Sequence, residues 1–339
     1  MTNHNKYRSV SRSRTPWDDS TELSPLEAFV RSNYKSHFEY HHSSLEHETE
    51  LLNSYTPKFC HICGDTESFS KRGHTRNGVQ RYWCSGCHKY FTITTGTIFQ
   101  DHKIPISEWI EYLLNLFGYS SINLNSKVNK NSPTTSKYWL KKVFILLEDY
   151  QDNTILTGDV WIDEFYYNVV RKDLYYKENG KLPRGLSVNK YCIGLATDGS
   201  HSYAVVEGKA KTSVPKTMKA FESHIAKESH LIHDSEHSHN SLVEKLCLSS
   251  TIYPTKDTKN LSDENNPMRR INHLCSALRS FLDSHPGFNR DELQDYLNLF
   301  CFMMDKPKNK LQKVDILLEK ALNTMKVIKF REYFSVKKP

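Results

Sequence analysis

The stretches FCHICG at residues 59–64 and WCSGCH at residues 83–88 decide how the first part of this chain can fold. Each contains a Cys-x2-Cys pair, and 20 residues separate the two pairs. Four thiolates on two such knuckles form the closed tetrahedral site that structural zinc prefers. We therefore predict that Cys60, Cys63, Cys84 and Cys87 bind zinc, and that residues 55–98 form a small β zinc ribbon that the metal staples.

The length and composition indicate a multidomain intracellular protein. The chain has 339 residues, of which 37% are hydrophobic, so it can build more than one core. It has no apolar run long enough for a membrane span and no apolar stretch after its basic start, so neither a membrane partner nor secretion is expected. In a reducing compartment disulfides are disfavoured. We interpret the other four cysteines as buried packing residues: Cys192, Cys247, Cys275 and Cys301.

The distribution of charge favours a nucleic-acid partner. Residues 68–100 and 112–147 contain no acidic residue but several basic ones, within a net charge of +7. Two consecutive basic blocks without acids are typical of a surface that binds a polyanion. The alternative is a solvated basic surface, which usually mixes both signs. The candidate DNA-binding residues are Lys71, Arg72, Arg76, Arg81, Lys137, Lys141 and Lys142.

Helical periodicity replaces the ribbon pattern in residues 104–150. ISEWIEYLLNLFGY (residues 106–119) predicts a helix with Ser107 as a possible N-cap, and SPTTSKYWLKKVFILLED (residues 132–149) predicts a second, basic helix. The polar residues between them indicate a turn. This arrangement predicts a helix-turn-helix DNA-binding domain, although an ordinary helical hairpin would show the same pattern. Residues 1–54 are polar, with one possible helix at residues 24–40.

Strands and helices alternate from residue 157 onward, which predicts an α/β domain at residues 157–304 and a helical tail at residues 305–339. VWIDEFYY (residues 160–167) is a strand that carries Asp163, and LIHD (residues 231–234) is a short strand that ends in Asp234. A buried carboxylate is costly unless it is paired or binds a metal. Two such residues at adjacent strand ends can share two Mg²⁺ ions for phosphodiester chemistry. Glu164 should point to the opposite face of the strand.

A helix after Pro267 can supply further groups to this pair. Asn272 and Arg279 are seven residues apart, so they share one face of that helix. An amide oxygen is a weaker metal ligand than a carboxylate, and an arginine can bind a DNA phosphate. The same helix could also have a purely structural role.

The ordered series of motifs resembles the DDE-type transposases of bacterial insertion sequences that carry an N-terminal zinc ribbon. The series covers roughly residues 55–335. It comprises the two cysteine pairs, TGTIF (95–99), SEWIEYLLNLF (107–117), VWIDEFYY (160–167), HLIHDSE (230–236), INHLCSALRSFL (271–282) and HPGFNRDELQDYLNLFCFMM (285–304).

This resemblance implies an RNase H-like catalytic domain that cuts and joins DNA at the ends of a mobile element. Asp163 and Asp234 match the first two catalytic acids, and Asn272 takes the third position, which is usually Glu and in some members Asn. Arg279 stands where the family usually has Lys, which keeps the charge but changes the geometry of a phosphate contact. Glu264 is a fallback third acid.

The function that the resemblance implies is that of an enzyme, a DNA transposase. It would bind terminal inverted repeats and target DNA, and catalyse Mg²⁺-dependent strand cleavage and transfer as a homodimer or larger assembly. It would act in the bacterial cytoplasm, associated with the nucleoid when bound to DNA. The alternative is a DNA-binding regulator with a zinc ribbon and a catalytically silent nuclease-like domain.

Overall fold

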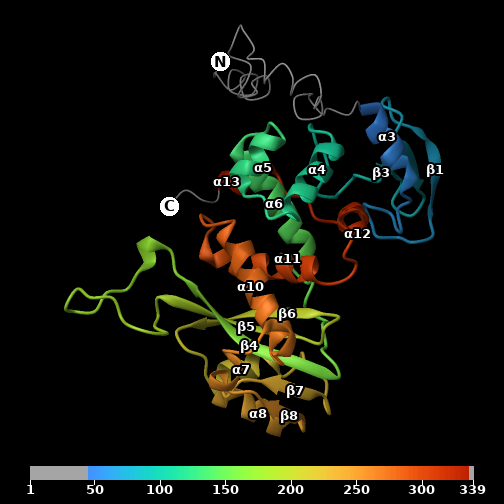
Figure 1. Ribbon diagram of the computed structural model, residues 1–339. Coiled ribbons are helices and arrows are strands. Elements are labelled where there is room, and N and C mark those ends of the chain that lie inside the picture. Colours follow the sequence, from blue (N-terminus) through green and yellow to red (C-terminus); the bar gives the residue numbers. More distant parts are fainter. Residues whose placement is uncertain (1–44, 336–339) are drawn as a thin grey trace, which may run out of the picture. The chain divides into compact units, whose positions relative to one another are not determined.

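The computed structural model describes residues 45–335 (Figure 1). They form two compact units, one of residues 45–146 with residues 310–335 and the other Leu147–Asn309. The predicted helical tail therefore divides: residues 310–335 belong with the N-terminal unit. The helix expected at residues 24–40 lies outside the described residues. Within residues 45–335, no helix is both long and apolar enough to cross a membrane.

The first unit begins with helix α3 (Leu45–Ser54) and a three-stranded antiparallel sheet. Its strands are β1 (Phe69–His74), β2 (Gln80–Cys84) and β3 (Lys89–Thr92). Gly78, at φ +81°, lies in the turn between β1 and β2, where a positive φ favours glycine. Tyr82 and Phe91 pack beside Cys60 and Cys84 in a very small core. So few apolar residues stabilise a fold weakly, which is why the cysteines matter to it.

Five helices complete this unit: α4 (Ile106–Leu116), α5 (Ile122–Val128), α6 (Pro133–Leu147), α12 (Lys310–Asn323) and α13 (Phe330–Ser335). The stretch expected to be only a turn forms α5, whose N-cap Ser121 accepts a hydrogen bond from the Leu124 N–H. The prediction of Ser107 as N-cap is wrong, because α4 starts after Pro105. α12 packs against α4.

The sheet of the second unit has five strands in the order β6-β5-β4-β7-β8. They are β4 (Asp159–Asn168), β5 (Lys190–Thr197), β6 (Ser202–Lys209), β7 (His230–His233) and β8 (Ser249–Ile252). β4 and β7 are the strands that the sequence predicted around Asp163 and before Asp234. β4, β5 and β6 pair antiparallel, whereas β7 pairs parallel with β4 and β8 parallel with β7. Parallel neighbours bring the carboxyl ends of β4 and β7 to one side of the sheet.

Helices cover both faces of this sheet (Figure 1). α7 (Val214–Phe221) and α8 (His237–Leu246) lie on one face, and α10 (Arg269–Asp283) and α11 (Leu293–Met304) on the other. Side chains of β4 alternate between the two layers. Ile162 joins the buried cluster that contains Phe221 and Leu242. Trp161 and Phe165 instead meet arginines of α10.

A buried polar network ties α11 to the sheet. The Asn298 side-chain oxygen accepts hydrogen bonds from the side-chain amides of Gln151 at 2.7 Å and Gln294 at 3.1 Å. Gln151 in turn bonds both main-chain groups of Ala204 in β6. Because Asn298 is only 5% exposed, its partners would lose these bonds without gaining water if it were removed.

The cysteines outside the two pairs are not all buried. Cys192 and Cys301 are buried, Cys275 is half-buried and Cys247 is exposed. The prediction of a packing role is therefore wrong for Cys247, which caps the C-terminus of α8 with φ at +54°. Its left-handed backbone turns the chain out of the helix, and its side chain points away from the core.

Candidate functional site

Cys60, Cys63, Cys84 and Cys87 converge in the ribbon. Their sulfur atoms all lie within 4.8 Å of one another, with Cys60 Sγ 3.8 Å from Cys87 Sγ and Cys63 Sγ 3.7 Å from Cys84 Sγ. A disulfide would hold two sulfurs about 2.05 Å apart. Four thiolates at about 2.3 Å from a tetrahedral ion would stand about 3.8 Å from one another. The cluster therefore has the spacing of a four-cysteine zinc site.

The electrostatics of this cluster also fit a cation. Burial, followed by the three neighbouring thiols, raises the pKa of Cys87 to about 12. The main-chain N–H of Cys87 is the main group that lowers the pKa of Cys84. Thiols packed this closely oppose one another's ionisation, and a divalent cation at their centre removes that opposition.

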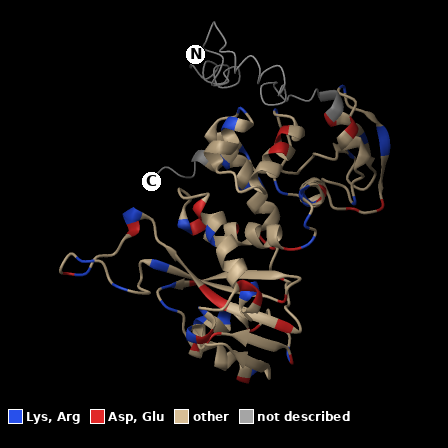
Figure 2. Cartoon of the chain, viewed as in Figure 1, with Lys and Arg blue, Asp and Glu red and all other residues tan. Residues whose placement is uncertain are grey.

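Basic residues lie along the edge strand of the ribbon, β1 (Figure 2). Lys71, Arg72 and Arg76 are exposed in β1 and the turn after it. Arg81 is half-buried in β2, where its guanidinium lies 4.5 Å from the centre of the Tyr90 ring. Lys71 pairs with Tyr82, so Arg81, the neighbour of Tyr82 in β2, points to the opposite face of the sheet.

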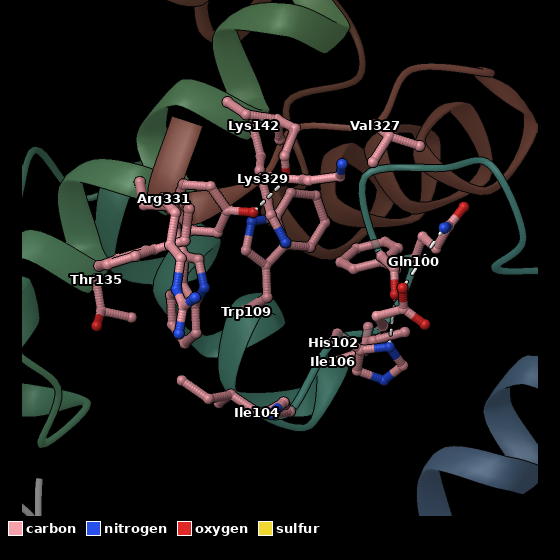
Figure 3. Close-up of a pocket in the computed structure, with 17 residues that line it drawn as sticks. Gln100, His102, Ile104, Ile106, Trp109, Thr135, Lys142, Val327, Lys329 and Arg331 are labelled. Carbon is pink, nitrogen blue, oxygen red and sulfur yellow. Dashed lines mark hydrogen bonds between the residues drawn. The ribbon is translucent and has the colours of Figure 1, made fainter. Parts of the chain in front are cut away.

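The three lysines of α6 do not share one environment. Lys137 and Lys141 are half-buried, whereas Lys142 is only 5% exposed. Its ammonium lies 4.9 Å from the Tyr138 ring and 5.4 Å from the Phe99 ring, and burial lowers its pKa to about 8. Lys142 lines a cavity of about 540 Å³ that the chain near Val327 and Arg331 helps to enclose (Figure 3). It points inward, so we leave it out of the proposed DNA interface.

The pairing of β4 with β7 places Asp163 and Asp234 together. Asp159 pairs with His230 and Trp161 with Ile232, a constant offset of 71 residues. Continued by two residues, this register sets Asp163 opposite Asp234, which directly follows β7. Adjacent strands lie about 4.8 Å apart. The two predicted carboxylates therefore meet at the carboxyl end of β7.

The surroundings of Asp163 disfavour its ionised form on balance. Its Oδ1 accepts a hydrogen bond from the Glu164 N–H at 2.8 Å, which favours the carboxylate. Burial, together with the charges of Asp234 and Glu164, outweighs that bond and raises the pKa of Asp163 to about 7. Close carboxylates with this behaviour are typical of cation sites and of general acids or bases.

α10 presents Asn272, Cys275 and Arg279 along one face. Burial, and next the charge of Asp163, raises the pKa of the Cys275 thiol, so this face is near Asp163. The guanidinium of Arg279 lies 4.8 Å from the centre of the Phe165 ring. Asn272 is half-buried one turn before Cys275. Glu264, the fallback acid, is exposed in a short 3-10 turn, η3 (Asp263–Asn265).

Two histidines that sequence reasoning did not single out adjoin the carboxylates. The Nε2 atom of His239, on α8, lies 2.9 Å from Glu164 Oε1, and its Nδ1 atom lies 3.9 Å from Asp234 Oδ1. His233, the last residue of β7, stands edge-on to His239 with ring centres 5.1 Å apart. The stretch HDSEHSH at residues 233–239 carried the signal, namely three histidines beside the second aspartate.

Neighbouring side chains of β4 point to opposite faces of the sheet here. Glu164 faces α8, as strand alternation predicted, while Asp163 influences Cys275 of α10. Burial opposes a charge on His239, but its hydrogen bond to Glu164 and the nearby carboxylates outweigh burial and raise its pKa. Burial lowers the pKa of His233 to about 4.

Comparison with protein-family models and with curated proteins gives no match. Among solved structures, the chain is similar to one in a simian T-cell lymphotropic virus intasome bound to the PP2A regulatory subunit B56 gamma. The identity is 14%, the TM-score is 0.24, and the match covers 48% of this chain and 56% of the viral chain. It is also similar to the pre-cleavage Mos1 transpososome, at 12% identity and a TM-score of 0.20, over 61% of this chain and 77% of the other. Likenesses this distant assign no function, so a functional proposal has to rest on the residues of this chain.

Proposed function

We propose that this chain is a DNA strand-cleaving and strand-transferring enzyme of the DDE transposase type, encoded by a bacterial insertion sequence. The observation that carries the proposal is the strand register that brings Asp163 opposite Asp234, with α10 alongside. Two half-buried carboxylates that repel each other destabilise a fold, so their presence needs a reason such as a metal ion.

The topology of the second unit supports an RNase H-like domain. Three consecutive antiparallel strands are followed by two strands parallel to the first, in the order β6-β5-β4-β7-β8. This is the strand order of RNase H-like folds. In that arrangement the first and fourth strands lie side by side; here the first, β4, carries Asp163 and the fourth, β7, is directly followed by Asp234.

The donor groups fit Mg²⁺, which prefers carboxylate oxygens. Asp163 and Asp234 would hold it with their carboxylates, and Asn272 would add only a neutral amide oxygen. A bound Mg²⁺ would activate a water or a 3′-hydroxyl and stabilise the leaving oxygen of a phosphodiester. Arg279 would bind a DNA phosphate, and its contact with Phe165 holds the guanidinium in place.

The first unit would recognise the DNA ends. The DNA phosphates of the terminal inverted repeats would be contacted by basic residues of the ribbon and of α6, namely Lys71, Arg72, Arg76, Arg81, Lys137 and Lys141. α5 and α6 would act as the helix-turn-helix, with α6 in the major groove. Zinc on the four cysteines would keep the ribbon folded. Pairing of two DNA ends would need at least a homodimer.

Strand nicking tests this proposal. Zinc-loaded wild-type protein should nick a duplex that contains the inverted repeats flanking its gene, in the presence of Mg²⁺ and at single turnover. Asp234→Asn should abolish nicking, because the remaining carboxylate cannot hold the ion alone, while the duplex is still bound. Asp257→Asn is the matched control, since that aspartate is exposed in the short helix α9 (Thr255–Thr258). Nicking by Asp234→Asn at the wild-type rate would overturn the assignment.

The second candidate is a DNA-binding regulator whose nuclease-like domain is silent. The uncharged Asn272 in the third position favours it, because two carboxylates bind Mg²⁺ less tightly than three. A wild-type protein that binds the repeats tightly but nicks none of them would support this reading.

A further inference from the structure

We propose a second metal site in this chain, formed by His233, Asp234 and His239, that binds a divalent transition-metal ion in preference to Mg²⁺. One ligand atom from each residue lies within 4.8 Å of the others. The site shares Asp234 with the proposed catalytic pair, but its two histidines lie on the α8 side of the sheet and have no part in the proposed strand-transfer chemistry.

The hydrogen bonding of His239 is that of a metal ligand. Its Nε2 atom contacts the Glu164 carboxylate at 2.9 Å, and a carboxylate can only accept, so Nε2 donates. A neutral ring then carries its lone pair on Nδ1. Metal-binding histidines commonly donate their second nitrogen to a carboxylate in this way, which fixes the tautomer and the ring orientation.

The nitrogen left over is buried and has no hydrogen-bond partner. His239 is fully buried, and its Nδ1 atom makes no hydrogen bond; the nearest carboxylate oxygen, Asp234 Oδ1, is 3.9 Å away. That distance is too long for a hydrogen bond. Two ligands about 2.1 Å from a tetrahedral ion stand about 3.4 Å apart, so a small inward movement would place an ion between them.

His233 is the third residue of the site. It is also fully buried, and neither of its ring nitrogens makes a hydrogen bond. An unsatisfied buried polar atom costs about 1–3 kcal/mol. Three such nitrogens on two touching rings therefore need an explanation, and an ion would take one nitrogen from each ring. A simple ion pair between His239 and the carboxylates would leave His233 unexplained.

The donor set determines the kind of ion. Two imidazoles and one carboxylate suit Zn²⁺, Co²⁺ or Mn²⁺, whereas Mg²⁺ prefers an all-oxygen shell. Asp234 is 30% exposed, so an ion can enter from its side. The arrangement leaves positions open for water or a DNA phosphate.

Electron spin echo spectroscopy of bound Mn²⁺ tests the site, because a directly coordinated imidazole nitrogen modulates the echo. The Asp163→Asn variant should be used with one equivalent of zinc, which the four cysteines take, because excess Zn²⁺ would compete with Mn²⁺ for the proposed site. This variant weakens the carboxylate pair and keeps both histidines. We expect nitrogen modulation in this variant, and Mg²⁺ should displace the Mn²⁺ only in large excess. His239→Ala in the same background should lower Mn²⁺ affinity at least tenfold and reduce the modulation, whereas the exposed His237→Ala should change neither.

The outcomes separate this site from the proposed function. Bound Mn²⁺ without nitrogen modulation would overturn the site, even in a protein whose wild type nicks DNA. Nitrogen modulation in the variant, together with a wild type that nicks no DNA, would support the site and count against the enzyme. Equal Mn²⁺ affinity in His237→Ala and His239→Ala would also overturn it. If His239→Ala fails to fold, the echo spectrum of the Asp163→Asn variant, which keeps both histidines, still decides the question.

Discussion

Replacing Asp163 with asparagine should stabilise the second unit when Mg²⁺ is absent. The folded protein raises the pKa of Asp163 from 3.8 to about 7, chiefly through burial and then through Asp234 and Glu164. Each pKa unit corresponds to about 1.4 kcal/mol, so the ionised carboxylate costs the folded state up to about 4 kcal/mol. Water that reaches this half-buried group reduces the cost, and we expect about 2–4 kcal/mol.

The sign of the pH dependence follows from the same shift. Below pH 3.8 the aspartate is protonated in both the folded and the unfolded chain, and it does not affect stability. Between pH 3.8 and about 7 the unfolded chain has lost the proton that the folded chain keeps, so stability falls as pH rises. Above about pH 7 the full cost is present. Asp163→Asn should remove this fall.

Hydrogen exchange of the β4 main-chain amides measures the effect locally. At about pH 8 without Mg²⁺, the amides near Asp163 should be better protected in Asp163→Asn than in the wild type, after correction for intrinsic rates. Mg²⁺ should raise protection in the wild type and much less in the variant. Equal protection of the two proteins at both low and high pH, with no effect of Mg²⁺, would refute the electrostatic account of the site.

Three further predictions concern other parts of the chain. Cys63→Ser should release zinc and unfold the ribbon, detected by metal analysis and by loss of dispersed ribbon signals in NMR spectra; a folded ribbon without metal would contradict the zinc assignment. Arg72→Glu should weaken binding to any duplex and lower the magnitude of the salt slope by about one or more, whereas Lys227→Glu, on the exposed loop before β7, should not. Asn298→Ala should lower the free energy of unfolding of the second unit by about 1–3 kcal/mol in urea titrations, because Gln151 and Gln294 lose a buried partner.

Local pattern predicted the elements well where a single preference decided them. The strand around Asp163, the short strand before Asp234 and the helix after Pro267 all follow from short stretches of sequence. The cysteine spacing likewise predicted a cluster, because two knuckles on one hairpin have few other ways to meet. At these positions, the conformation that each residue prefers is also the one that its neighbours in the sequence prefer.

Tertiary packing decided what the sequence did not show. Lys142 carries the same charge as Lys141, but the turn of α6 and the chain near Val327 enclose it. α5 is short and polar, and hydrogen bonds from Asn125 and Asn129 to main-chain oxygens of α4 hold it as a helix. Such contacts depend on residues distant in the sequence, so no local sequence pattern predicts them.

The same reason explains the histidines of the candidate site. Asp163 and Asp234 could be expected together because adjacent strands carry them. The contact of His239 with Glu164 joins α8 to β4 across 75 residues, and only the fold specifies it. His233 and His239 were visible beside Asp234 in the sequence, but their burial and unpartnered nitrogens were not.

The most direct test of the central claim, that Asp163 binds the metal ion used for strand cleavage, is a change of metal preference. Asp163→Cys replaces a hard oxygen ligand with a softer thiolate, which favours Mn²⁺ over Mg²⁺. Single-turnover nicking of the inverted-repeat duplex should be lost in Mg²⁺ and partly restored in Mn²⁺ for Asp163→Cys, but restored by neither ion for Asp163→Ala. Equal responses of the two variants to Mn²⁺, or nicking by both at the wild-type rate in Mg²⁺, would contradict the claim.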